Sequence, residues 1–146
     1  IDGKNSKLGI ESTVVDLTGR PKILRKGIID AIQIKKILKI NYVKKSSYIK
    51  SPGLLSKHYS PGIPMRLNKK KCNKTYAFIT FGKKYGNKSN HFNLSKKSDL
   101  KEAASNLYKT FRIIKKKGFK KIYVVKIPNK GPGVAINDRL KRASNK

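Results

Sequence analysis

The chain has 146 residues, a formal net charge of +30 and a single cysteine. This length fits one ordinary domain or two small pieces, and one cysteine excludes an internal disulfide framework and a zinc site built from several cysteines. The longest apolar runs are short and interrupted by lysine, so no segment is expected to span a bilayer, and the N-terminus lacks a signal-peptide pattern. These features favour a cytoplasmic protein without a membrane partner.

The positive charge has two interpretations. An excess of 37 Lys and Arg over 7 Asp and Glu is typical of proteins that contact nucleic acid. However, most of these cations are lysines accompanied by many Asn and Ile, and A/T-rich codons encode all three. Arginine, which offers paired donors to phosphate, is not enriched. Codon bias is therefore the stronger explanation, and RNA contact the weaker one.

The first 38 residues predict a β-hairpin followed by a helix. Residues 9–17, GIESTVVDL, contain the β-branched residues of a strand, and residues 22–25, KILR, form a second short strand after a turn at residues 18–21. Asp30 is expected to cap a helix over residues 31–38. These elements are too few to bury a core alone.

The beginning of the chain suggests that a larger domain precedes it. The first residue is Ile1, and the only methionine is Met65. We therefore expect residues 1–42 to be the last part of a larger domain.

Residues 43–64 are predicted to form a linker. Pro52 and Pro61 bracket the segment SPGLLSKHYSP, and prolines at both ends exclude a regular element. His58 and Tyr59 stand in this loop, where packing does not require such side chains, and this favours a functional role. The pair can equally pin the linker to a neighbouring domain.

Residues 65–146 predict a small α/β domain. The alternation of two buried strands and two helices predicts a parallel sheet in a three-layer α/β/α, Rossmann-like arrangement. The expected elements are a strand at 75–81, a polar loop at 83–98, a helix capped by Ser98 or Asp99 and ending at Gly118, a strand at 122–127 and a helix at 134–143.

In the first part of the chain, few residues are candidates for ligand binding or catalysis. The hydroxyls of Ser12 and Thr13 suit a small polar ligand, although in strands these residues are more often plain sheet residues. Arg25 and Lys26, followed by Gly27, suit a phosphate or else form a solvated basic pair.

The C-terminal part offers no catalytic constellation. The glycine-rich KGPG at residues 130–133 lacks a nucleotide-binding spacing and is expected to be a tight turn. Asp138 and Arg139 are expected to be surface charges or caps. With only His58 and His91 as histidines, a metal site built from this chain alone is not expected.

Three strings in order carry a resemblance to a known family. GIESTVVDLTGRPKILRKG, the linker SPGLLSKHYSP and the terminal GPGVAINDRLKRAS resemble the C-terminal part of the long-form threonylcarbamoyl-AMP synthases, in which a YrdC-like domain carries an added C-terminal domain. The likeness covers nearly the whole chain. It implies the truncated end of a YrdC-like α/β domain, a linker and a small C-terminal α/β domain.

The resemblance also implies an activity. The family activates L-threonine with bicarbonate and ATP to give threonylcarbamoyl-adenylate and pyrophosphate, with Mg²⁺ expected to accompany ATP. A threonylcarbamoyl-transferase complex then modifies tRNAs that read codons beginning with A. Ser12 would help to bind threonine, Arg25 would face the nucleotide phosphates, and Tyr59 and His58 would contact the nucleotide from a lid over the cavity.

Two departures and one alternative remain. Leu54, Leu55 and Ser56 replace the linker's usual Met, Lys and first Tyr, and Lys26 replaces a proline after Arg25. The family's main ATP and threonine residues would precede Ile1, so the chain is not expected to be active alone. The alternative is a non-catalytic, basic RNA-binding or partner-docking protein.

Overall fold

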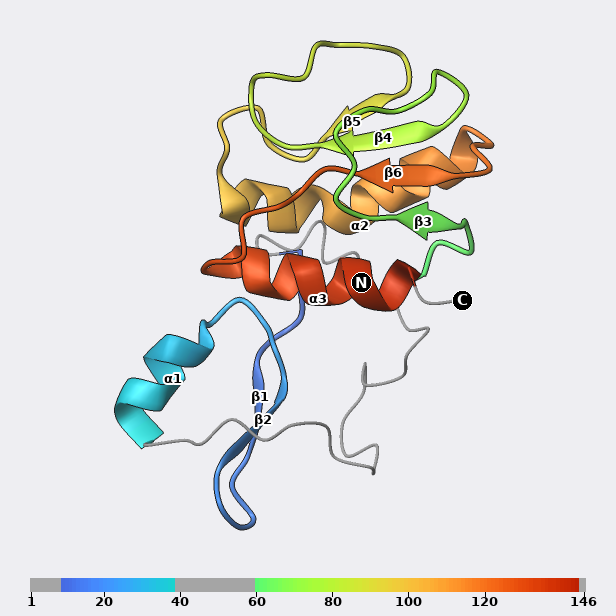
Figure 1. Ribbon diagram of the computed structural model, residues 1–146. Helices are drawn as coiled ribbons and strands as arrows, with labels where there is room; N and C mark the ends of the chain where they lie inside the picture. The colour runs from blue at the N-terminus through green and yellow to red at the C-terminus, as the bar shows by residue number, and fades with distance from the viewer. Residues whose placement is uncertain (1–8, 39–59, 145–146) are drawn as a thin grey trace, which may run out of the picture.

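The computed structural model describes residues 9–38 and 60–144 and contains two sheets. A two-stranded hairpin and the helix α1 form one part of Figure 1, and a four-stranded sheet with the helices α2 and α3 forms the other. The α/β class and the parallel sheet predicted from the sequence are confirmed.

The hairpin joins β1 (Val14–Asp16) to β2 (Lys22–Arg25) in antiparallel register, with Val15 opposite Ile23. The side chain of Asp16 stabilises the turn, because its Oδ1 accepts hydrogen bonds from the backbone N–H (3.0 Å) and the hydroxyl (2.7 Å) of Thr18. β1 is shorter than the predicted strand over residues 9–17. Gly9 has a left-handed φ of 60°, which extended strand backbone does not have.

The helix α1 (Ala31–Leu38) begins at the predicted cap. Asp30 Oδ1 accepts a hydrogen bond of 3.1 Å from the N–H of Ile32. None of the residues of α1 is buried, and Ile32 and Ile37 are 63% and 81% exposed. The first part of the chain therefore leaves large aliphatic side chains in solvent.

The larger sheet has the strand order β3-β6-β4-β5, and every pairing in it is parallel. It contains β3 (Met65–Arg66), β4 (Ala77–Thr80), β5 (His91–Asn93) and β6 (Ile122–Val124). The strands β4 and β6 lie within apolar runs that the sequence identifies. The strands β3 and β5 were not predicted, because two residues are too few for a pattern and HFN has no apolar alternation.

The helix α2 (Leu100–Lys116) connects β5 to β6 and passes behind the sheet in Figure 1. Its cap is Asp99, which accepts from the N–H of Lys101 at 2.7 Å, and Gly118 follows its end with a φ of 75°. The helix α3 (Pro132–Ser144) contacts both α2 and β3. Among the helices that the structure describes, none combines the length and the apolar character needed to cross a membrane.

Side chains from the loop after β4 and from β5 cover part of the sheet face that carries Phe78. The rings of Tyr85 and His91 meet the ring of Phe78 edge-on, with centroids 5.7 and 5.3 Å away. Because successive side chains of a strand point to opposite faces of the sheet, Ile79 lies on the other face, where it is fully buried. This layering explains why all four residues of β4 are buried.

Cys72 is a free cysteine in the segment that connects β3 to β4. Its Sγ lies 3.3 Å from the carbonyl oxygen of Asn73 and 3.5 Å from that of Tyr76. Burial raises the pKa of the Cys72 thiol, so the neutral form is favoured up to a higher pH than in an exposed cysteine. A neutral thiol is a poor nucleophile, which favours a packing role.

Candidate functional site

Ser12 and Arg25 lie in contact at the hairpin. The guanidinium of Arg25 donates from Nε to the carbonyl oxygen of Ser12 at 3.1 Å and from Nη2 to its hydroxyl oxygen at 3.2 Å. Ser12 is exposed and Arg25 is half-buried, so both polar groups lie at the surface of the described chain. The structure thus brings together two of the residues that the sequence analysis selected.

Gly27 allows the chain after β2 to approach the segment before β1. A Cβ added to Gly27 would lie 2.2 Å from the N of Thr13 and 2.3 Å from the carbonyl carbon of Ser12. The N–H of Gly27 donates to the hydroxyl oxygen of Thr13 at 3.1 Å, and that hydroxyl donates to the carbonyl oxygen of Ile29 at 2.8 Å. Glycine is therefore needed here for close contact, and Thr13 holds the two chain segments together.

Glu11 connects this segment to the helices. Its carboxylate accepts from the hydroxyl of Tyr108 in α2 at 3.3 and 3.4 Å, and from Nε of Arg139 in α3 at 3.1 Å. Arg139 also pairs with Asp138, through Nη1 and Oδ2 at 2.8 Å, and Arg142 donates to the same carboxylate at 2.9 Å. Glu11 was not among the candidate residues predicted from the sequence.

The prediction that Arg139 is a surface charge or a cap is wrong. The residue has no exposed area. Ala135, Ile136, Leu140 and Ala143 are also buried, so the three- and four-residue spacing places Arg139 on the buried face of α3. This spacing in the sequence could have predicted that Arg139 is buried. It was not used, because a cation was expected to lie in solvent.

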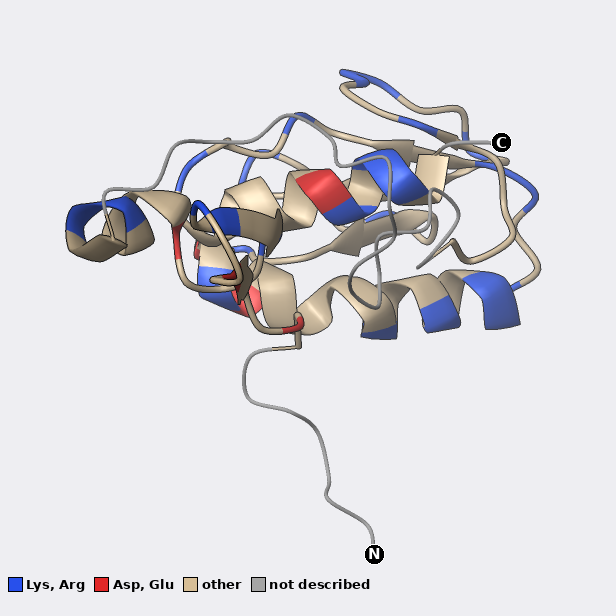
Figure 2. Cartoon of the chain, turned by 90° about the horizontal axis from the view of Figure 1, so that it is seen from below, with Lys and Arg blue, Asp and Glu red and all other residues tan. Residues whose placement is uncertain are grey.

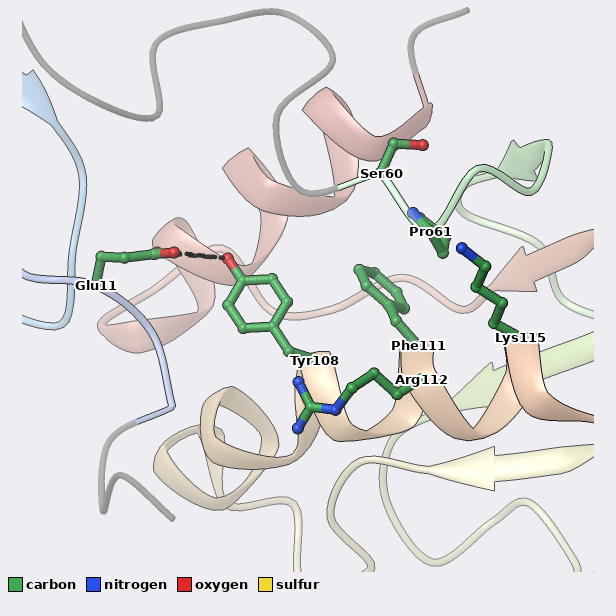
Figure 3. A pocket seen from close by; sticks show the side chains of 7 residues that line it. All are labelled: Glu11, Ser60, Pro61, Tyr108, Phe111, Arg112 and Lys115. Carbon is green, nitrogen blue, oxygen red and sulfur yellow. Dashed lines mark hydrogen bonds between the residues drawn. The ribbon is translucent and has the colours of Figure 1, made fainter. Parts of the chain in front are cut away.

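A hollow of about 390 Å³ lies next to Glu11. Tyr108 and Phe111 project from α2 toward it, and Arg112 and Lys115 from the same helix stand at its side (Figure 3). The other lining residues are Ser60 and Pro61, which close the SPGLLSKHYSP segment. The hollow therefore combines aromatic walls with two cations and one carboxylate.

The other candidates from the sequence are the two histidines, Tyr59 and the KGPG segment. His58 and Tyr59 lie outside the described residues. Within the KGPG segment the N–H of Gly133 donates to the carbonyl oxygen of Lys130 at 2.9 Å, as expected of a tight turn before α3. His91 Nδ1 lies 2.9 Å from the carbonyl oxygen of Gly86, a structural contact. Residues 9–38 and 60–144 contain no group of three or more His, Cys, Asp or Glu side chains suited to a metal ion.

The comparisons with known proteins agree with this geometry. Residues 29–145 match the family described as threonylcarbamoyl-AMP synthase, C-terminal domain. The threonylcarbamoyl-AMP synthase of Pyrococcus abyssi is 31% identical over 166 residues, which cover 99% of this chain and 48% of that protein. The chain thus spans about half the length of this curated relative.

Solved structures give the same result. The crystal structure of P. abyssi Sua5 complexed with L-threonine has a TM-score of 0.78 and 27% identity, over 95% of this chain and 47% of that one. A P. abyssi Sua5 variant, with alanine in place of an adjacent histidine and tyrosine, supports the fold with a TM-score of 0.76 and 24% identity, over 94% and 46%.

The fold defines an α/β protein of the Sua5 type, with a parallel C-terminal sheet preceded by a hairpin and a helix. More specifically, the chain belongs to the threonylcarbamoyl-AMP synthase family through its C-terminal domain. The resemblance noted in the three sequence strings is thereby confirmed.

Proposed function

We propose that this chain acts as the C-terminal half of an L-threonylcarbamoyladenylate synthase. In the proposed reaction the amine of L-threonine combines with bicarbonate to form a carbamate and water. The carbamate oxygen then attacks the α-phosphorus of ATP, and pyrophosphate leaves. The observation that carries the proposal is the contact between Ser12 and Arg25 at the surface of a chain that belongs to this family.

The geometry suits two neighbouring ligands. The exposed hydroxyl of Ser12 would hydrogen-bond L-threonine, with which P. abyssi Sua5 is complexed in its crystal structure. The guanidinium of Arg25 would face the ATP phosphates, for which its planar donors are well suited. Since Nη2 of Arg25 is 3.2 Å from the hydroxyl oxygen of Ser12, threonine and the phosphates would lie side by side.

The proposal also assigns roles to a lid, to a metal ion and to a partner complex. His58 and Tyr59 would contact the nucleotide from a lid that excludes water from the adenylate. The sequence contains only one adjacent His-Tyr pair, and a pair of this type was replaced in the P. abyssi variant. Mg²⁺ would accompany ATP, and a threonylcarbamoyl-transferase complex would use the product on tRNA in the cytoplasm.

Exposed aliphatic side chains in the first part of the chain favour the proposal that this part belongs to a larger catalytic domain. Leu17, Ile29, Ile32 and Ile37 are each more than half exposed, and all four lie in or near the hairpin and α1. Large aliphatic side chains grouped in this way favour contact with further protein surface. We propose that the rest of a YrdC-like domain covers them and contributes the main residues for ATP and threonine.

The proposed activity is tested on the complete protein that contains this chain. Pyrophosphate release from ATP is measured with L-threonine and bicarbonate, with each omitted in turn, and with L-valine in place of threonine. We expect release to require both co-substrates. Release that is independent of threonine or of bicarbonate would contradict the proposed function.

The lid is tested by replacing Tyr59 with alanine, with Tyr59→Phe as the matched control that retains the ring. We expect Tyr59→Ala to raise the KM for ATP about tenfold, the effect of losing ~1.4 kcal/mol of binding. The measurement is the initial rate of pyrophosphate release at varied ATP. A KM for ATP that is equal in the wild type and Tyr59→Ala would exclude the lid contact.

The alternative, a basic RNA-binding domain, gains no support from the arrangement of charge. Lys and Arg lie on α1, along α2, on α3 and on the loops around the sheet rather than on one face (Figure 2). Such a distribution is expected of codon bias. Tight tRNA binding by residues 62–146 with a steep salt dependence would favour the alternative.

A further inference from the structure

The buried cation Arg139 is the starting point for an inference about the candidate threonine site. A guanidinium without exposed area is costly unless carboxylates pair with it. Arg139 has two such partners, Asp138 at 2.8 Å and Glu11 at 3.1 Å. Asp138 is its neighbour in α3, whereas Glu11 is 128 residues away in sequence. The second contact therefore connects α3 to the hairpin part of the chain.

The contact with Glu11 has further support from α2. The hydroxyl of Tyr108 donates to the same carboxylate, as Figure 3 shows. Two residues before Glu11, the backbone of Gly9 lies so close to α2 that an added Cβ would be 2.4 Å from Cα of Ser105. Residues 9–11 are thus held against the C-terminal domain by backbone contact and by a charged hydrogen-bond network.

Ser12 follows Glu11 directly, and Arg25 of the hairpin binds its carbonyl oxygen and its hydroxyl. Ser12 is therefore held on one side by the hairpin and, through Glu11, on the other side by α2 and α3. A shift of Glu11 would be transmitted to the Ser12 backbone, because only one peptide bond separates them.

We propose that Arg139 is a positioning residue that fixes Glu11, and thereby Ser12, in the geometry that binds L-threonine. This inference rests on the proposed function, since it assigns Ser12 to threonine. It gives the C-terminal domain a defined part in substrate binding. The domain supplies a buried arginine that orients the segment before β1, without contacting the substrate itself.

The test compares Arg139→Met with Arg142→Met in the complete protein. Both changes remove a guanidinium that binds Asp138, and Arg139→Met also removes the ion pair with Glu11. We expect Arg139→Met to raise the KM for L-threonine at least tenfold while the KM for ATP changes less than twofold. Arg142→Met should leave both KM values within twofold of the wild type.

A purely structural role would give a different result. It predicts a lower melting temperature for Arg139→Met with equal changes in both KM values, or with none, and either outcome would overturn the inference. If Arg139→Met does not fold, the pair Glu11→Gln and Glu11→Gln/Arg139→Met takes its place, because the double variant leaves no uncompensated charge between these two positions. Wild-type protein without threonine-dependent pyrophosphate release would refute the proposed function instead.

Discussion

Replacing Gly27 by alanine is expected to reduce threonine-dependent pyrophosphate release by the complete protein about 100-fold, the scale of a 1 Å displacement in a catalytic site. The new Cβ would lie 2.2 Å from the N of Thr13 and 2.3 Å from the carbonyl carbon of Ser12. Both atoms belong to the backbone, so the segment before β1 must move away from Arg25. The measurement is kcat/KM for L-threonine.

Gly19→Ala is the matched control for this prediction. Gly19 lies in the turn of the same hairpin, and an added Cβ would meet nothing within 4 Å. Its φ is not in the left-handed region, so alanine is tolerated there. Equal kcat/KM values for Gly27→Ala and Gly19→Ala would show that the spacing between the hairpin and Ser12 does not affect activity.

Gly133→Ala is expected to lower the free energy of unfolding by about 3 kcal/mol, the upper range for forcing an extra methyl group into a packed site. Gly133 is buried at the start of α3, and its added Cβ would lie 2.0 Å from the carbonyl oxygen of Pro128. Relief of that contact requires α3 to shift from the chain after β6. Urea unfolding followed by circular dichroism gives the free energy.

The control for this prediction is Gly86→Ala, in the loop that precedes β5. Its Cβ would have open space, and its φ is not left-handed. We expect a change of less than about 0.5 kcal/mol, as for other surface substitutions. A similar loss of stability in both variants would argue against tight packing between Gly133 and Pro128.

The sequence predicted those parts of the fold that depend on local signals. Asp30 and Asp99 cap α1 and α2 because their carboxylates accept hydrogen bonds from N–H groups two residues further on, in the first turn of each helix. The apolar runs around Phe78 and Tyr123 gave two of the strands. The strands β3 and β5 were not predicted, because their pairing with β6 and β4 depends on strands distant in sequence and not on their own residues.

The candidate site was only partly predictable. Ser12 and Arg25 were selected separately, and their contact depends on the hairpin register, which includes a shift between Val14 and Val15. The pairing of Glu11 with Arg139 could not be read from either residue, since it requires the C-terminal helix to lie beside the segment before β1. Long-range charge pairs of this kind follow from the tertiary fold.

This lysine-rich chain retains a few arginines. The sequence has only six, and three of them, Arg25, Arg139 and Arg142, donate through a guanidinium to oxygen atoms of the described residues. An ammonium group supplies charge at one point and cannot reproduce directed donors in one plane. In such lysine-rich proteins, the rare arginines are therefore a practical guide to the positions where geometry, rather than charge alone, constrains the side chain.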